Sequence, residues 1–191
     1  MNIVVRKATH ADLQYAQAIC DEMEESAKKR GTGIAKRDPE YIKKKMNDEN
    51  SVIAFVGGKI AGFSYIEVYD DGEFVANSGL IVFPEFRALG IAKKIKKEIF
   101  KLSRSKFKKA KIVSITTSAI VMKMNTDLDF KPVTFSELPV SDRFWNGCKS
   151  CVNYEILMKK DKKVCLCTGL LYDPEKNQSK IKKFIQKWQK K

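Results

Sequence analysis

The sequence predicts an α/β fold in which a mixed, mainly antiparallel central sheet is flanked by helices. Three observations support this fold class. Short segments rich in β-branched and aromatic residues alternate with amphipathic segments at helical spacing. Two turns join three successive strands, and a fourth strand follows a long amphipathic helix, which is the order of a parallel crossover. The 191 residues are enough for one domain with its own core.

A strand and two helices open the chain. The apolar residues 2–7 predict the strand. The first helix begins at Thr9, which has the spacing of a capping box with Asp12, and its apolar residues recur every three or four positions. The second helix covers residues 39–46 and has proline at its first position.

Three antiparallel strands follow, at residues 51–56, 59–69 and 74–82. The first turn between them is Gly57-Gly58, and glycines supply the positive φ angles that a two-residue hairpin requires. The second turn is Asp70-Asp71-Gly72. The three strands therefore predict a meander.

A crossover follows the meander. The helix at residues 90–103 places isoleucine or leucine at 91, 95, 99 and 102, which form one apolar stripe. The apolar run at 111–117 then predicts a buried strand parallel to residues 74–82.

The C-terminal third predicts a helix at residues 119–128 and a strand at 131–135. Two further segments, 152–158 and 164–172, flank the turn sequence KKDKK and predict a hairpin. We expect residues 1–173 to form the domain. Residues 174–191 are expected to form a basic C-terminal helix or tail, with Ile181, Phe184, Ile185 and Trp188 on one apolar face. We expect this face to pack on the domain, and a membrane or partner helix is the alternative.

The charge balance favours anionic ligands. Lysine and arginine number 37 against 23 acidic residues, a formal net charge of +14. Nucleic acid, anionic membranes and phosphorylated small molecules all fit this charge. The N-terminus lacks the apolar core of a secretion signal, and no apolar run has the length of a membrane span. We therefore expect a cytoplasmic protein without membrane association.

The segment FPEFRALGIAKKIKKEIF, residues 83–100, narrows the choice of anion. Its helix begins near Gly90 without an acidic residue in the first turn, although a helix N-terminus normally attracts one. Arg87, Lys93 and Lys94 add positive charge there. A bound pyrophosphate would compensate this charge, whereas lysines that simply face water are the alternative. Neither GxxxxGK[ST] nor GxGxxG occurs.

Residues 82–92, VFPEFRALGIA, resemble the signature V-x-P-x-[YF]-R-x-x-G-[IL]-[GA] of the GNAT superfamily of acyl-CoA-dependent N-acyltransferases. The predicted element order resembles that fold over about residues 1–173. The resemblance implies acetyl-CoA as acyl donor. It also implies that the backbone of Leu80, Ile81 and Val82 pairs with the pantetheine arm. The amides implied to hold the pyrophosphate are those of Arg87, Ala88, Leu89, Gly90, Ile91, Ala92 and Lys93.

Three further segments resemble a bacterial GNAT group associated with arginine biosynthesis. They are RGTGIAKRDPEYI, ANSGLIVFPEFR and CVNYEILM. This resemblance implies a small-molecule amine as acceptor, with the α-amino group of glutamate as one candidate, and acetyl or succinyl as the acyl group.

Acyl transfer to an amine needs a base and a proton source for the departing thiolate. GNAT enzymes usually supply the proton from a tyrosine four residues before a Gly-Phe pair. Here the pair reads Asp129-Phe130 and the matching residue is Asn125, which cannot act as an acid but could hydrogen-bond CoA. Glu67 is the candidate base, with a solvated carboxylate as the alternative, and Ser78 could orient a water.

Arg37 is the candidate substrate-binding residue. It ends the segment between the first two helices, where the resemblance implies a substrate site, and a guanidinium can hold a carboxylate by two hydrogen bonds. Arg6 and Lys36 are the alternatives.

Four cysteines fall in a CxxC and a CxC pair, at Cys148 and Cys151 and at Cys165 and Cys167. This spacing is compatible with a Cys₄ zinc site. The predicted hairpin, however, would place Cys165 opposite Leu157 and hold Cys151 several residues away along the strand, too far for both to bind one zinc ion. We therefore disfavour zinc, predict no metal and expect buried reduced thiols, with a redox or disulfide role as the alternative.

Two other functions compete with acyl transfer to a small amine. One is a basic module that binds RNA or protein. Nucleic acid is disfavoured because the aromatic residues mostly occupy core-like strand positions. The other is a GNAT fold that binds CoA without turnover. The sequence does not decide between a monomer and a homodimer.

Overall fold

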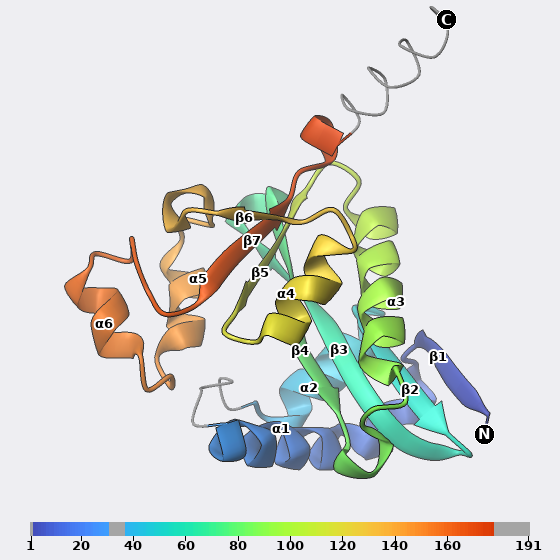
Figure 1. Cartoon of the computed structure of the whole chain (residues 1–191). Helices are drawn as coiled ribbons and strands as arrows, with labels where there is room; N and C mark the ends of the chain where they lie inside the picture. The colour runs from blue at the N-terminus through green and yellow to red at the C-terminus, as the bar shows by residue number, and fades with distance from the viewer. Residues whose placement is uncertain (1, 31–36, 178–191) are drawn as a thin grey trace, which may run out of the picture.

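The computed structural model describes residues 2–30 and 37–177, and these form a seven-stranded sheet with helices on both faces (Figure 1). The strand order is β1-β2-β3-β4-β5-β7-β6. The strands are β1 Ile3–Lys7, β2 Ser51–Val56, β3 Lys59–Tyr69, β4 Phe74–Val82, β5 Lys111–Thr116, β6 Lys131–Val133 and β7 Thr168–Tyr172. The α-helices are α1 Ala16–Arg30, α2 Pro39–Asn47, α3 Ile91–Lys106, α4 Ala119–Thr126, α5 Asp142–Trp145 and α6 Tyr154–Lys159.

The sheet is antiparallel except at one junction. β1 to β4 pair antiparallel in sequence order, and β7 pairs antiparallel with both β5 and β6. The α3 crossover makes β4 and β5 parallel. The expected mixed, mainly antiparallel α/β fold is confirmed, and so are the meander and the crossover.

β4 and β5 separate after three residue pairs. The last of these pairs joins Ala76 to Val113. Beyond it, β5 pairs with β7 and β4 pairs with β3 alone among the described strands. The stretch of β4 from Asn77 to Val82 therefore has an open edge that faces the gap.

A bulge at Gly79 interrupts β4 inside this open stretch. Between Phe63 and Tyr65, β3 advances two residues while the facing part of β4 advances three. Gly79 has a φ of 63°, and a Cβ atom there would lie 2.3 Å from the Tyr65 ring. Only glycine fits this position, and the bulge bends the strand where the gap opens.

Separate apolar cores lie on the two faces of the sheet. Ile19 of α1 and Ile42 of α2 pack with Phe63 on one face. Ile95 and Ile99 of α3 pack against β2 and β4 on the other. In Figure 1 α1 and α2 accordingly lie across the sheet from α3. The predicted apolar stripe of α3 is confirmed.

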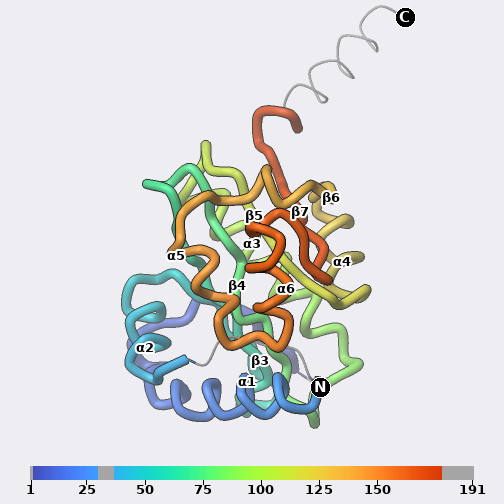
Figure 2. Tube along the Cα trace, turned by 90° about the vertical axis from the view of Figure 1, so that its left-hand side faces the viewer, coloured from blue at the N-terminus to red at the C-terminus, as the bar shows by residue number. Residues whose placement is uncertain are grey.

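The predicted hairpin of 152–158 with 164–172 is wrong. Tyr154–Lys159 forms α6, because Glu, Leu, Met and Lys are good helix formers and only Leu157 of this segment is fully buried. β7 pairs with β5 and β6 instead of the preceding segment. Figure 2 shows α5 and α6 as the outermost layer on this side of the molecule.

Two expectations about the ends of the chain are not tested. The domain boundary at residue 173 stays a prediction, and the apolar face expected at residues 181–188 lies outside the described residues. No helix in the described part of the chain has the length and hydropathy needed to cross a membrane.

Candidate active site

The turn between β4 and α3 presents backbone amides to one side. Ala88 and Gly90 have φ values of 65° and 73°, and nothing lies within 4 Å of the position that a Cβ atom would take at Gly90. The first α3 bond runs from the Lys94 amide to the Gly90 carbonyl at 3.3 Å. The amides of 91–93 precede this bond, and helix-terminal donors of this kind bind anions.

Two charges near this turn already have partners. Arg87 contacts Glu22 of α1 at 3.0 Å, and Lys93 contacts Asp127 at 3.3 Å. The Arg87 amide also donates to the Pro84 carbonyl at 3.2 Å. The protein therefore supplies part of the expected negative charge. The amides after Arg87 are the better candidates for a pyrophosphate site.

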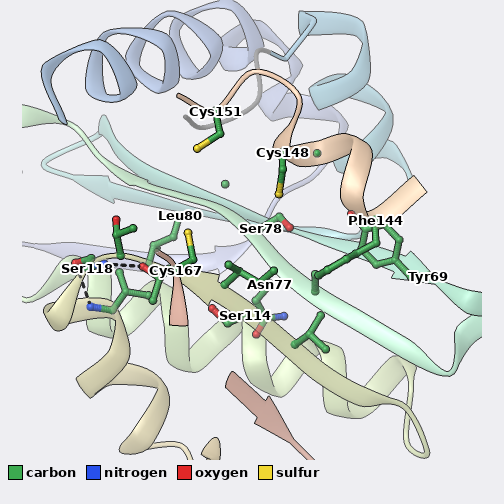
Figure 3. A pocket seen from close by; sticks show the side chains of 18 of the residues that line it. Tyr69, Asn77, Ser78, Leu80, Ser114, Ser118, Phe144, Cys148, Cys151 and Cys167 are labelled. Atoms are coloured by element: carbon green, nitrogen blue, oxygen red, sulfur yellow. Dashed lines mark hydrogen bonds between the residues drawn. The ribbon is translucent and has the colours of Figure 1, made fainter. Parts of the chain in front are cut away.

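A cavity of about 360 Å³ occupies the gap between β4 and β5 (Figure 3). Residues 77–80 of β4 line it on one side and residues 113–118 line it on the other. Figure 3 shows Ser78 and Leu80 beside this cavity. The open β4 edge here can add backbone hydrogen bonds to an extended ligand, as an edge strand does. Ile81 and Val82 lie farther along the strand, outside the cavity lining.

A second cavity, of about 550 Å³, lies on the α2 side of the sheet. Glu67, Arg143 and Lys149 line it. Arg37 and Tyr69 line both cavities, which therefore meet at these two side chains. A molecule in the first cavity can contact a molecule in the second there.

Glu67 is a buried carboxylate with one unsatisfied oxygen. Its side chain is 4% exposed, and burial raises its pKa to about 7, while Arg143 and Arg37 oppose the rise. Its Oε2 lies 3.0 Å from Lys45 Nζ and 3.5 Å from an Arg143 nitrogen. Its Oε1 has no hydrogen-bond partner among the described residues. An unpaired oxygen with a near-neutral pKa suits a general base.

Residues 15–120, more than half of the chain, match the family model described as the Acetyltransferase (GNAT) family. The chain belongs to this family. The resemblance seen in residues 82–92 is thereby confirmed, and acyl-CoA-dependent N-acetyltransferase chemistry follows from it at the level of the family.

Solved structures share the GNAT fold with this chain at low sequence identity. N-acetylglutamate synthase from Neisseria gonorrhoeae, complexed with coenzyme A and N-acetyl-glutamate, has a TM-score of 0.62 and 14% identity over 91% of this chain and 35% of that one. Rv2747 from Mycobacterium tuberculosis, in complex with CoA and NLQ, has a TM-score of 0.61 and 15% identity over 89% and 98%. yncA from Salmonella typhimurium, with its cofactor acetyl-CoA, has a TM-score of 0.62 and 14% identity over 91% and 95%.

These identities establish the fold alone, and the chain spans about a third of the Neisseria enzyme. No curated protein matches the sequence significantly. The relatives' own names show that GNAT folds of this shape hold CoA or acetyl-CoA. Acetyl-CoA is the acyl donor that fits this acetyltransferase.

Asn125 of this acetyltransferase lies behind the cavity wall. Its side chain is fully buried, and its Nδ2 donates to Ser114 Oγ at 3.0 Å. Ser114 lines the cavity. The Asn125 Oδ1 has no partner among the described residues. Direct contact between Asn125 and CoA stays a prediction.

Arg37 of the GNAT domain is held by aromatic groups. Its Nε donates to the Tyr65 hydroxyl at 2.6 Å, and its guanidinium lies 5.6 Å from the centre of the Tyr41 ring. Of the two alternatives, Arg6 forms a bidentate pair with Asp12 at 2.7 and 2.8 Å, and Lys36 lies outside the described residues. Arg37 therefore remains the candidate for substrate binding.

The geometric argument against zinc fails with the hairpin on which it rested. Cys148, Cys151 and Cys167 all line the first cavity, and Figure 3 shows their thiols pointing into it. Burial raises the pKa of Cys148 to about 11 and that of Cys167 to about 12, so both are protonated at neutral pH. In the described ranges no His, Cys, Asp or Glu side chains form a metal-binding group. The expected full burial of the four cysteines is wrong, because all four are half-buried. Their role as reduced thiols stays a prediction.

Sequence reasoning missed Lys45 and Arg143 as neighbours of Glu67. Lys45 follows Tyr41 by four residues, so both lie on one face of α2, and this spacing was a usable signal. Arg143 is brought there by α5, and no local pattern predicts that contact.

Proposed function

We propose that this protein transfers an acetyl group from acetyl-CoA to the primary amine of a small molecule. The observation that supports this proposal most is the meeting of two cavities at Arg37 and Tyr69. One follows the open edge of β4, where the acyl-CoA arm would pair. The other contains the buried carboxylate of Glu67. An amine in the second cavity would thus face a thioester in the first.

Glu67 would act as the general base. It would accept a proton from the attacking amine through Oε1, which has no other partner among the described residues. Ser78 lies on the same sheet face, because Tyr65 pairs with Ser78 and Glu67 pairs with Ala76. Its hydroxyl could orient a water for this proton transfer.

The charges of the second cavity support an acceptor that carries a carboxylate. Three cationic side chains, Arg37, Arg143 and Lys149, line it with two acidic ones, Asp38 and Glu67. Guanidinium groups bind carboxylates by paired hydrogen bonds. We propose glutamate as the acceptor, a substrate class that the name of the Neisseria enzyme also suggests. The reaction would then belong to cytoplasmic amino-acid metabolism.

The acceptor is tested by a panel of L-glutamate, L-glutamine, L-lysine and putrescine with acetyl-CoA or succinyl-CoA, monitored by released thiol. We expect the highest kcat/KM with acetyl-CoA and L-glutamate. A clear preference for putrescine would contradict a carboxylate-binding pocket. If none of these amines causes thiol release, the proposed acceptor class is wrong.

Arg37→Met tests the carboxylate contact. We expect the KM for L-glutamate to rise by about tenfold or more, because a charge-assisted bidentate pair is lost. The KM for acetyl-CoA should change far less. Lys43→Met on the nearby helix α2 is the control, since Lys43 forms a surface pair with Glu40 and does not line the cavity. Equal KM values for Arg37→Met and Lys43→Met would exclude the contact.

A further inference from the structure

Lys96 of α3 is buried in the floor of the first cavity. The residue is 2% exposed, and its Nζ lies 5.1 Å from the centre of the Phe130 ring. In the described part of the chain its ammonium forms no hydrogen bond or ion pair. Burying an ammonium without an ion pair or hydrogen bond lowers the stability of the folded protein. We therefore expect a ligand group beside it that compensates this cost.

Lys96 approaches the gap from the side opposite to Glu67. Ala92, Lys96, Ile99 and Ser103 recur at spacings of three or four and lie on one face of α3. At the end of this row, Ser103 Oγ accepts from Asn77 Nδ2 at 2.7 Å. Asn77 is the first β4 residue beyond the last pair with β5. The row therefore runs beneath the gap through which a thioester would pass.

Two more buried polar atoms near this floor lack partners. They are Asn77 Oδ1 and Asn125 Oδ1, and both are unsatisfied among the described residues. Asn77 lines the cavity directly, and Asn125 reaches it through Ser114. Buried polar atoms are rarely left unsatisfied, so these atoms point to a polar ligand group above the floor.

We propose that Lys96 donates a proton to the sulfur of CoA as the thioester breaks, an inference that rests on the proposed function. The helix rises ~1.5 Å per residue, which places Lys96 about 7.5 Å beyond Ile91, where the diphosphate would bind. An arm that runs from that diphosphate along β4 passes over Lys96. This side chain thus supplies the acid that the asparagine at position 125 cannot.

The proton and electron balance of this step is complete. The neutral amine attacks the thioester carbonyl, a C–N bond forms, and its proton passes to Glu67. The C–S bond then breaks, its electron pair stays on sulfur, and the Lys96 ammonium protonates that sulfur. Glu67 and Lys96 return to their starting states through water, without a further reactant.

The acidity of Lys96 suits this role. Burial alone lowers its pKa to about 7. A free thiol has a pKa of about 8.5, so an ammonium of that acidity can protonate a departing thiolate. Arg37, Tyr69, Cys148, Cys151 and Cys167 are the other titratable groups that line the cavity. None of them contributes to the shift of Lys96.

Calorimetry with CoA and desulfo-CoA, which lacks the thiol, tests the contact without any acceptor. We expect the parent protein to bind CoA about tenfold more tightly than desulfo-CoA. In Lys96→Met this preference should fall to about twofold or less. Lys97→Met is the matched control, because Lys97 is exposed on the same helix and should keep the full preference.

The outcomes separate this inference from the proposed function. Failure of both ligands to bind the parent would overturn the proposed function. If CoA and desulfo-CoA both bind tightly, and the preference for CoA is the same in the parent and in Lys96→Met, only the role of Lys96 is overturned. The variant should fold, because methionine removes a buried charge at similar volume, and thermal unfolding checks this.

A kinetic arm tests proton donation itself. With L-glutamate as acceptor, the parent should lose kcat above about pH 7 as the ammonium deprotonates. Lys96→Met should have a lower kcat and no such decline. A purely structural lysine would leave the shape of the profile unchanged, and that result would contradict the proposal.

Discussion

At the scale of single residues, Glu67 combines two properties that rarely occur together. It is a carboxylate with basic neighbours, Lys45 and Arg143, yet its pKa is raised. Burial causes this, because the low-dielectric surroundings disfavour the charged form more than the neighbouring cations favour it. The group therefore changes protonation close to neutral pH, where a base must accept and release protons.

Glu67→Gln tests this assignment. We expect kcat/KM to fall by about 100-fold or more at pH 8, since the amide cannot accept the proton of the amine. Below about pH 7 the parent activity should rise with pH as Glu67 deprotonates, and the variant should lack this acidic limb of the profile. Glu73→Gln is the control, because Glu73 forms a surface pair with Lys111 at 3.1 Å and should behave as the parent.

The same shift predicts a change in stability with pH. A carboxyl with a folded pKa of about 7 holds a proton that the unfolded chain has already lost, between about pH 4.5 and 7. The contribution of Glu67 to the free energy of unfolding therefore falls as the pH rises through this window. Urea titrations at pH 5 and pH 7.5 should show a larger decrease for the parent than for Glu67→Gln. Equal decreases would mean that the shift is absent.

At the scale of elements, the β4 bulge sets the shape of the site. Gly79→Ala should destabilise the protein by about 3 kcal/mol or more, because the new Cβ is strained at positive φ and collides with Tyr65. Gly72→Ala also has positive φ, at 92°, but nothing lies within 4 Å of its Cβ position, so its cost should be about 1 kcal/mol. Urea denaturation measures both. Equal costs would show that the contact with Tyr65 is unimportant.

A carboxylate in the first turn of α3 should change helix stability and CoA affinity in opposite directions. Ala92→Asp should stabilise the helix by about 0.3–1 kcal/mol, since a carboxylate favours the N-terminal dipole. It should weaken CoA binding by about tenfold or more, because it repels the diphosphate. Calorimetry with CoA and with pantetheine, which lacks the diphosphate, should show a loss for CoA alone.

Ala92→Asn controls for size in this comparison, because asparagine matches the shape of aspartate without its charge. Equal losses of CoA affinity in the two variants would mean that size, and not charge, disturbs the site.

The sequence predicted those elements that depend on short patterns of neighbouring residues, and it did not predict contacts between distant segments. The strands of the meander, the crossover helix and the turn at residues 82–92 all follow from short patterns, and all occur. β7 was assigned the wrong partner, because its pairing with β5 joins segments that lie far apart in the chain. Lys96 belongs to a lysine-rich run, and such a run predicts a solvent-exposed helix face. Its place in the cavity lining depends on the separation of β4 and β5, which no local pattern encodes.

At the scale of the whole molecule, the net charge of +14 would attract any polyanion. Most large aromatic side chains of the described residues contribute to the cores, which leaves few to stack on bases. Examples are Phe63, Phe130 and Trp145. Charge therefore brings anionic ligands to the surface, and the two cavities provide the selectivity.

Hydrogen exchange with and without CoA tests the central claim, that the α3 turn holds the diphosphate while the arm lies along β4. We predict that CoA slows exchange of the amides at 88–93 and at Leu80 and Val82. An RNA oligonucleotide of similar charge should leave them unchanged. Protection elsewhere, or none with CoA, would contradict the account.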